Sequence, residues 1–570
     1  MISSLNAILS KELIGSLKVF FLLFSISALL ETLSIAALIP FFQVLGGHSE
    51  FIFVNKFLNY FNIFPQKKND LLYLLLLIIF IFFTIKSIFI SYFSFYQCNF
   101  ILNLRSFLNQ KLYRIYLYSP YDFYLNNNSS KIIRNISEVD IVVKYIKNLV
   151  ILINEILVFL AIFFFLIFLE PTGSIMIIFG IGCISFFFLK KYKKKIEFWG
   201  KIRLKYLAEK LKRIQETLIL IKEIKIYQKF KTYENSFIAS DKLVNFSDFK
   251  QSFLDSMPKI WLEWLLFLSI IVLCSLLLFL HKETAYIITT LGLLAVSSYR
   301  LLPSVIRISN VLQSIQYHKS TFNLICRELQ RKYIYTENKK YNKINFSKKL
   351  IIKNLDYGYS LNGKKIINNI NLKINFGEII GIIGESGAGK TTLINLILGL
   401  IKPANGKILV DNQNIFENLE SWHNCIGYIS QDVYLLDDTI KNNIAFGMSN
   451  KDIDNLLLNR SVDQSKLSSL IGGSKNGINT KIGELGKRIS GGQKQRIGIA
   501  RAFYNDPKFL IFDEATSSLD NETERKIISE IRLLKKKKTV IIVSHKLSSL
   551  KYCDKIYKLS KLGLKKFKII

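Results

Sequence analysis

Long apolar runs separated by polar stretches occupy the first 311 residues of the chain. Six of these runs have about 20 residues or more, the length that an α-helix needs to cross the hydrocarbon core of a bilayer. They lie at roughly 17–42, 71–96, 146–169, 172–190, 261–280 and 285–311. The pattern therefore predicts a membrane domain of six transmembrane helices, to which we assign residues 1–330.

The polar segments between the predicted spans also carry a helical pattern. In KYLAEKLKRIQETLILIKEIKIY (205–227), apolar residues recur at helical spacing with charged residues between them. We therefore expect the spans to continue as long helices beyond the membrane. Residues 331–349 are polar and charged, which is typical of a linker. From 350 to 570 short β-rich runs alternate with helical ones, which predicts an α/β domain.

Lysine and arginine are concentrated on one side of the predicted membrane domain. The segments 98–145 and 190–258 are rich in both, whereas the links near 170–171 and 281–284 are very short. Basic loops face the cytoplasm in most membrane proteins. We therefore expect a multi-pass membrane protein with both termini and the α/β domain in the cytoplasm.

The overall composition excludes an ordinary soluble enzyme. Half of the 570 residues are hydrophobic, the mean hydropathy is +0.28 and the formal net charge is +35. Such a charge can indicate nucleic-acid binding. Here the basic runs follow apolar spans, as at 190–195, so we favour membrane-edge loops and expect no nucleic-acid partner. The six cysteines form no CxxC pair and predict neither a zinc site nor a disulfide framework.

The segment GESGAGKT (384–391) has the spacing of a phosphate-binding P-loop. It follows an apolar strand candidate at 379–383 and precedes a helix candidate, which is the context that this motif requires. Glycines let backbone N–H groups close around phosphate oxygens, and the helix N-terminus adds a favourable dipole. The pattern predicts ATP and Mg²⁺ as cofactors. The residues assigned to them here are Gly384, Gly387, Gly389, Lys390, Thr391 and Thr392, with Lys390 on the β- and γ-phosphates and Thr391 on Mg²⁺.

A second motif, KFLIFDE (508–514), is an apolar strand that ends in two carboxylates. Asp513 is a candidate ligand of Mg²⁺, and Glu514 is a candidate for orienting or deprotonating the attacking water in phosphoryl transfer. The alternative is a strand end with two solvated acids.

The segment ISGGQKQR (489–496) resembles the LSGGQ signature of the ATP-binding cassette (ABC) family, with Ile489 in place of leucine. The resemblance implies that this segment contacts the γ-phosphate held by the P-loop of the opposite subunit. The residues that it assigns to the nucleotide are Ser490, Gly491, Gly492 and Gln493.

Other segments resemble further landmarks of the same family, in the same order along the chain. Tyr359, in YGYS, matches the aromatic residue that stacks on adenine. Gln431, in ISQD, matches the Q-loop and is assigned to Mg²⁺ and catalysis, and Asp520, in SSLD, matches the D-loop. His545, in VSHKL, matches the switch histidine that contacts the γ-phosphate, so it is assigned to catalysis with Glu514.

Two further segments resemble the exporters of the ABC family. TKIGELG (480–486) is similar to their X-loop, and 118–140 is similar to the inner loop that carries a short docking helix. The resemblance implies the type IV exporter fold, with a six-helix membrane domain fused to one α/β P-loop ATPase. Because each ABC site pairs a P-loop with a signature from another cassette, it also implies a homodimer with two competent sites.

Several charged residues interrupt the predicted spans. Lys86, Lys259, Arg300 and Arg307 are the candidate substrate residues, and Arg300 and Arg307 share a helix face because seven residues make almost two turns. A charged side chain inside a bilayer usually faces a water-filled cavity or an oppositely charged side chain. One interpretation is a cavity for a phosphate or pyrophosphate cargo. The other is internal ion pairing with Glu31, Glu155 or Glu263, for instance Arg300 with Glu263, or extension of Arg307 to the interface.

The bacterial PglK-type flippases have corresponding segments that resemble 29–43, 257–267 and 297–309 of this chain. This resemblance implies a lipid-linked oligosaccharide, a polyprenyl pyrophosphate carrying a glycan, that is moved to the outer leaflet for glycoconjugate or N-glycan synthesis. The aromatic loop 51–66 is either a surface segment that touches a lipid tail or an ordinary loop helix. The alternatives are a general exporter of lipids, drugs or peptides, and a non-transporting ABC ATPase. We regard an importer as a poor fit, because importers usually keep the two domains in separate chains.

Overall fold

The computed structural model describes most of the chain in two units. The described residues are 10–38, 40, 41, 44, 68–169, 171–280, 284–331, 344–359, 365–516, 519–560 and 563–567. The first unit comprises Met1–Ser119 and Tyr124–Tyr335, and the second comprises Pro120–Phe123 and Thr336–Ile570. The division at 335 falls inside the linker predicted at 331–349.

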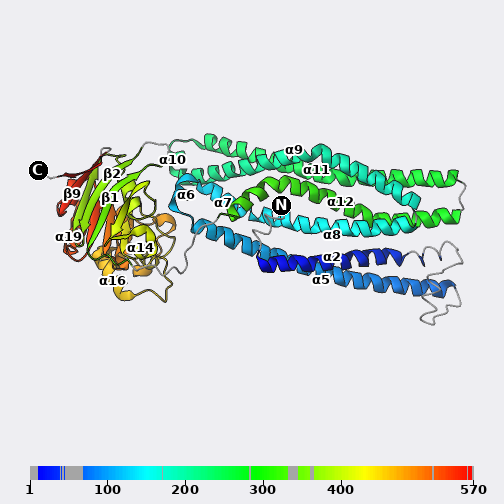
Figure 1. Cartoon of the computed structure of the whole chain (residues 1–570), viewed down its shortest axis with the longest axis horizontal. Helices are drawn as coiled ribbons and strands as arrows, with labels where there is room; N and C mark the ends of the chain where they lie inside the picture. Colours follow the sequence, from blue (N-terminus) through cyan, green and yellow to red (C-terminus); the bar gives the residue numbers. More distant parts are fainter. Residues whose placement is uncertain are drawn as a thin grey trace. The chain divides into compact units, whose positions relative to one another are not determined.

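Long helices build the first unit, and several lie alongside one another (Figure 1). α2 packs against both α5 and α8, while α12 packs against α8, α9 and α11. The long helices are α2 (Lys11–Ala36), α5 (Lys68–Leu117), α8 (Val139–Leu169), α9 (Pro171–Ile219), α11 (Phe230–Phe279) and α12 (Thr284–Leu329). The short helices are α6 (Tyr121–Asn126), α7 (Ser129–Ser137) and α10 (Ile221–Ile226).

Four helices in the described part of the chain are long and apolar enough to cross a membrane. Their apolar segments are Glu12–Ser34, Asn69–Leu117, Ser129–Phe168 and Phe230–Phe279. The two remaining predicted spans, 172–190 and 285–311, fall on α9 and α12, where many side chains lie outside the description. The count of six therefore stays a prediction, and the loop at 51–66 lies outside the described residues.

The prediction that helices continue through the polar segments between the predicted spans is confirmed. α9 continues through the basic run after residue 190 as far as Ile219, and α10 covers most of the remaining residues up to 227. Packing explains why such long helices form: on α5, Leu104, Leu108 and Leu112 recur every fourth residue and are fully buried.

Two β-sheets organise the second unit, as the α/β prediction requires. The four-stranded sheet has the order β2-β1-β4-β5, with β1 (Lys349–Tyr357), β2 (Ile367–Asn375), β4 (Asn405–Val410) and β5 (Gln413–Asn414). The six-stranded sheet has the order β10-β9-β3-β8-β7-β6. Its strands are β3 (Ile379–Gly384), β6 (Ile426–Ile429), β7 (Phe509–Asp513), β8 (Thr539–Val543), β9 (Lys555–Ser560) and β10 (Gly563–Phe567).

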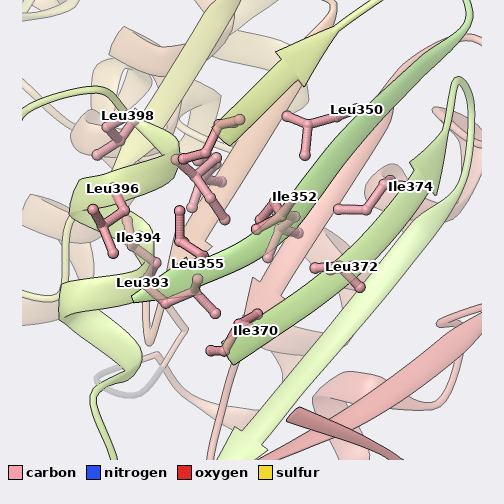
Figure 2. Packing of buried hydrophobic residues seen from close by; sticks show 14 of the residues in the cluster. Leu350, Ile352, Leu355, Ile370, Leu372, Ile374, Leu393, Ile394, Leu396 and Leu398 are labelled. Carbon is pink, nitrogen blue, oxygen red and sulfur yellow. The ribbon is translucent and has the colours of Figure 1, made fainter. Parts of the chain in front are cut away.

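An aliphatic core joins the four-stranded sheet to α13 (Lys390–Ile397). Figure 2 shows Ile352 and Leu355 of β1 and Ile370 of β2 near Leu393 and Leu396 of that helix. Trp422, fully buried in the same core, donates a hydrogen bond from Nε1 to the Ile397 carbonyl at 2.8 Å. These contacts fix the helix that follows the P-loop. The remaining helices of the unit are α14 (Leu419–His423), α15 (Ile440–Ile444), α16 (Asn455–Gln464), α17 (Ser468–Gly472), α18 (Gly491–Tyr504) and α19 (Asn521–Leu533).

Four strands of the six-stranded sheet, β6, β7, β8 and β3, are parallel neighbours. In this register Val543, the last residue of β8, lies opposite Ile382 on one side and Asp513 on the other. The carboxyl ends of these strands therefore meet at one edge of the sheet. In open parallel sheets this edge is where ligands bind.

Candidate functional site

The sheet edge gathers motifs that are more than 150 residues apart in sequence. β3 leads into the P-loop, β7 ends at Asp513 and Glu514, and β8 leads to His545. The P-loop and the strand that ends in Asp513 and Glu514 are predicted from their own patterns, and His545 from the ABC resemblance. The parallel register brings all of them to one place.

The P-loop turns sharply before α13. Gly387 and Gly389 have φ angles of +79° and +96°, in the left-handed region that favours glycine. The Nζ of Lys390 donates to the carbonyl oxygens of Gly384 and Glu385 at 2.9 and 3.2 Å. The lysine therefore arches back over its own loop, and its ammonium group lies at the mouth of the loop.

Glu514 and His545 lie against each other and against the P-loop lysine. The Nε2 of His545 is 2.7 Å from Oε1 of Glu514, and the Nζ of Lys390 is 3.2 Å from the same nitrogen. Oε1 of Glu514 and Nζ of Lys390 thus both lie within hydrogen-bonding distance of Nε2, and this nitrogen can donate to the carboxylate or accept from the ammonium group. Glu514 has φ of +51° and donates its backbone N–H to the Val543 carbonyl at 2.9 Å. This bond to β8 holds the unusual backbone that directs its carboxylate.

Asp513 is nearly inaccessible at the end of β7, with 3% of its surface exposed. Burial raises the pKa of its carboxyl group to about 6, and the neighbouring charge of Glu514 contributes to the rise, while Tyr428 and Lys390 oppose the shift. Tyr428, on β6, donates its hydroxyl to Oδ2 of Asp513 at 3.5 Å. The sequence interpretation missed Tyr428, because no motif reveals that β6 is the strand beside β7.

The predicted aromatic residue Tyr359 lies just after β1. Its ring is half exposed and packs edge-on against Tyr357, with centroids 5.3 Å apart. Its hydroxyl lies 3.3 Å from Oγ1 of Thr392, in the first turn of α13. Tyr359 and Thr392 are therefore brought together with the P-loop helix, as their shared assignment requires.

The signature segment forms the start of α18. Ser490 is the N-cap, and its backbone N–H donates to Oε1 of Gln493 at 2.8 Å while its Oγ accepts from the Gln493 N–H at 3.3 Å. This reciprocal capping box leaves Gly491 and Gly492 in the first turn of the helix. Asp520 is likewise the N-cap of α19 and accepts from the Thr523 N–H at 2.9 Å. The first two D-loop residues, 517 and 518, lie outside the described part of the chain.

Gln431 follows β6, and its side chain is exposed. It lines a cavity of about 510 Å³ together with Leu485, from the segment 480–486, and Gly491 of the signature. The structure thus places Gln431 beside the signature helix within one unit.

Two of the four candidate substrate residues in the first unit form ion pairs with glutamates. The Nζ of Lys86 lies 2.7 Å from Oε2 of Glu31 and donates to Oγ of Ser34 at 3.2 Å. The Nε of Arg307 lies 3.3 Å from Oε1 of Glu155. The ion-pair interpretation therefore describes both residues, although Arg307 pairs with Glu155 rather than extending to the interface. Lys259 is exposed on α11, and the side chain of Arg300 lies outside the described residues.

Comparison with known proteins identifies the second unit. Residues 367–517 match the model of the ABC transporter family. These residues form an ABC transporter domain. The second unit therefore contains an ABC transporter domain.

Curated relatives match about a third of the chain. A putative export ATP-binding/permease protein of Rickettsia prowazekii is 42% identical over 214 residues, which is 37% of each chain. An ATP-dependent lipid A-core flippase of Ralstonia nicotianae is 36% identical over 36% of this chain and 35% of its own. The leukotoxin translocation ATP-binding protein LktB of Mannheimia glucosida is 40% identical over 37% of this chain and 30% of its own. The matched part of this chain spans about a third of the length of these relatives.

A solved structure extends the likeness beyond the ABC domain. A bacterial Atm1-family ABC exporter with ATP bound superposes with a TM-score of 0.79 at 18% identity, covering 96% of this chain and 94% of that one. The chain therefore has the fold of an ABC exporter, in its long helices as well as in its ABC domain.

The ABC domain fits ATP and Mg²⁺. A side chain at Gly387 would meet open space, and no side chain caps the N-terminus of α13, so its first N–H groups remain available for phosphate oxygens. Thr391 is exposed in that first turn and Asp513 ends β7, which supplies the oxygen ligands that Mg²⁺ prefers. Among the described residues no cluster of three His, Cys, Asp or Glu could hold a metal alone.

Proposed function

We propose that this protein is an ATP-driven exporter that moves a lipid-linked oligosaccharide from the cytoplasmic to the outer leaflet of the bacterial inner membrane. The observation that carries the proposal is the meeting of Lys390, Asp513, Glu514 and His545 at one sheet edge in a chain with the exporter fold. This edge supplies the parts of an ATP hydrolysis site, and the long apolar helices supply the path that hydrolysis would drive.

Each residue at the edge has a role in the proposed cycle. Lys390 and the α13 N-terminus hold the β- and γ-phosphates, while Thr391, Asp513 and Gln431 hold Mg²⁺. Glu514 orients and deprotonates the attacking water, and His545 donates to the γ-phosphate. Tyr359 stacks on the adenine. In this structure His545 contacts Glu514, so in the proposed cycle nucleotide binding replaces this contact with one to the γ-phosphate.

A homodimer completes the site. In the proposed arrangement Ser490, Gly491, Gly492 and Gln493 of one chain close over the nucleotide held by the P-loop of its partner. Asp520 lies at the same junction, at the start of α19. ATP binding then draws the two ABC domains together, and hydrolysis releases them, which alternates the access of the membrane helices.

The cargo is the finer part of the proposal. A lipid-linked oligosaccharide combines an apolar tail with a large polar headgroup, so its carrier needs a polar site within apolar helices. Arg307 offers such a site, because 47% of its side chain is exposed while its Nε lies 3.3 Å from Glu155. Lys86 is bound by Glu31, and Lys259 and Arg300 are assigned here to the same headgroup path. One relative, an ATP-dependent lipid A-core flippase, is named for a lipid cargo.

ATP-dependent translocation of a polyprenyl-pyrophosphate oligosaccharide in proteoliposomes tests the proposal. We expect translocation by the unmodified chain, none by Glu514→Gln, and a loss of at least tenfold by the Arg300→Ala/Arg307→Ala double variant. If active chain, verified by its own ATP hydrolysis, moves none of this lipid but its hydrolysis is stimulated by other apolar compounds, the general-exporter alternative replaces the oligosaccharide cargo.

A further inference from the structure

A polar cavity of about 340 Å³ lies among α2, α5, α8 and α12 of the first unit. Its walls include Glu31, Gln97, Asn154, Glu155 and Arg307, together with the ring of Phe93. A water molecule occupies roughly 30 Å³ in the liquid, so the space is about ten times that needed for one water. The cavity is therefore large enough for a ligand group, and its walls combine polar and apolar side chains.

The charges of this cavity are already compensated in pairs. Glu31 is bound by Lys86 at 2.7 Å, and Glu155 is bound by Arg307 at 3.3 Å. Both carboxylates are almost fully buried, at 3% and 4% exposure. A phosphate placed here would face two carboxylates, and an ammonium group would add a positive charge with no opposite partner. Either ion would carry an electrostatic cost in this apolar surrounding.

Two oxygen atoms in the wall nevertheless need a hydrogen-bond donor. Oδ1 of Asn154 and Oε2 of Glu155 are buried and have no hydrogen-bond partner among the described residues. A buried acceptor without a donor destabilises a structure, so such atoms usually mark a bound group or water. Both atoms are acceptors, which specifies a ligand that donates.

We propose that this cavity binds an uncharged glycosyl group of the exported amphiphile, with sugar hydroxyls donating to Asn154 and Glu155. A hydroxyl satisfies both oxygens without disturbing the charge balance, which neither an ammonium group nor a phosphate does. The amide of Gln97 offers a further donor and acceptor, and the Phe93 ring offers an apolar wall for a sugar face. The inference rests on the proposed function, since it gives the export helices a headgroup site, and it assigns that site to the sugar rather than to the pyrophosphate.

Photolabelling of the full chain tests this site without requiring transport. The probe is an alkyl glucoside with a diazirine beside its headgroup, applied in phosphatidylcholine nanodiscs in the absence of ATP and mapped by peptide mass spectrometry. We expect labelling on the cavity-lining turns of α5 and α8. Competition by an unlabelled alkyl glucoside should be at least tenfold more effective than by an alkyl ammonium or an alkyl phosphate of the same chain length.

Variants on α8 sharpen the test. Asn154→Leu and Glu155→Gln should each weaken the apparent affinity for the glucoside by about tenfold. Asn148→Leu is the matched control, because Asn148 lies on the same helix and donates to Ser314 at 2.8 Å outside the cavity lining. Should Glu155→Gln fail to fold, Asn154→Leu and Gln97→Leu provide the same comparison.

The outcomes separate the inference from the proposed function. Stronger competition by the ammonium or the phosphate compound overturns the glycosyl assignment, as does equal labelling of the unmodified chain and Asn154→Leu. Specific glucoside labelling in a chain that moves no lipid-linked oligosaccharide supports the site and rejects the export proposal. Export without labelling at α5 and α8 supports the export proposal and rejects the site.

Discussion

The Nε2 of His545 lies 2.7 Å from Oε1 of Glu514, at the edge where the P-loop also ends. The two residues come from the ends of adjacent parallel strands, β8 and β7. Glu514 has the left-handed φ of +51°, a conformation that costs on the order of 1–3 kcal/mol for a residue other than glycine. A carboxylate held in this way by its backbone and by a histidine is prepared for one role, which the first prediction addresses.

Replacement of Glu514 by glutamine should stop hydrolysis while leaving nucleotide bound. The glutamine amide keeps the shape of the side chain but cannot accept a proton from water, so we expect the rate of phosphate release to fall by about 10²–10⁴-fold. Phosphate release and ATP retention by the full chain measure the two effects separately. Glu522→Gln is the control, because Glu522 is exposed on α19 and pairs with Lys526. Loss of ATP binding together with hydrolysis would show instead that Glu514 supports the fold of the site.

Magnesium affinity should fall as the solution is acidified through pH 6. The pKa of Asp513 is raised from its usual 3.8 to about 6, so the carboxyl group is protonated below that pH and cannot bind Mg²⁺. We expect the apparent Mg²⁺ affinity to decrease by roughly tenfold per pH unit below 6. Titration calorimetry of the nucleotide-bound chain between pH 5 and 8 measures it. Asp513→Asn should bind Mg²⁺ weakly at every pH; an equally steep pH dependence in this variant would assign the effect to another group.

The raised pKa of Asp513 also affects the stability of the ligand-free domain. Because the folded pKa of Asp513 lies above the unfolded one, this residue destabilises the ligand-free domain at pH 7. That penalty is relieved as the pH falls through about 6. Asp513→Asn should therefore raise the thermal midpoint of the ligand-free chain at pH 7 more than at pH 5. Equal effects at the two pH values would contradict the shift.

Variants of Ser490 should separate its structural role from its proposed role on the nucleotide. Ser490→Ala removes the N-cap of α18 and should cost about 1 kcal/mol of stability, whereas Ser490→Asn keeps a good cap and should cost little. Both should lose ATP hydrolysis, since neither side chain reproduces the short hydroxyl. Thermal unfolding and phosphate release are measured on the same samples. If Ser490→Asn hydrolyses ATP at the full rate, the role of Ser490 is limited to capping α18.

The pair of Lys86 and Glu31 should behave as a buried structural ion pair. Lys86→Met removes the cation that lies 2.7 Å from the nearly inaccessible Glu31, which costs about 3–5 kcal/mol. The double variant Lys86→Met/Glu31→Gln should recover most of this loss, because no charge then remains unpaired. Unfolding of the full chain in nanodiscs measures the difference, with exposed Lys242→Met on α11 as control. If Lys86→Met unfolds at the same midpoint as the unmodified chain but loses transport, Lys86 is a substrate contact instead.

The sequence alone determined the local elements of this protein. The runs of apolar residues specify helices long enough for a membrane, since each residue adds a fixed rise and few polar groups interrupt them. The P-loop and the strand ending in Asp513 and Glu514 also follow from local pattern, because each needs a particular order of glycines, apolar residues and charges. The α/β class of residues 350–570 was readable for the same reason.

Only the tertiary structure decided which side chains meet. Tyr428 reaches Asp513 because β6 pairs with β7, and strand order leaves no mark on either segment. Lys86 pairs with Glu31, and Arg307 with Glu155, because the helices are rotated so that these faces coincide. An isolated sequence specifies the face of each helix but not the helix that covers it. The partner of a buried charge is therefore set by packing, which here places a glutamate beside each of two candidate cargo contacts, Lys86 and Arg307.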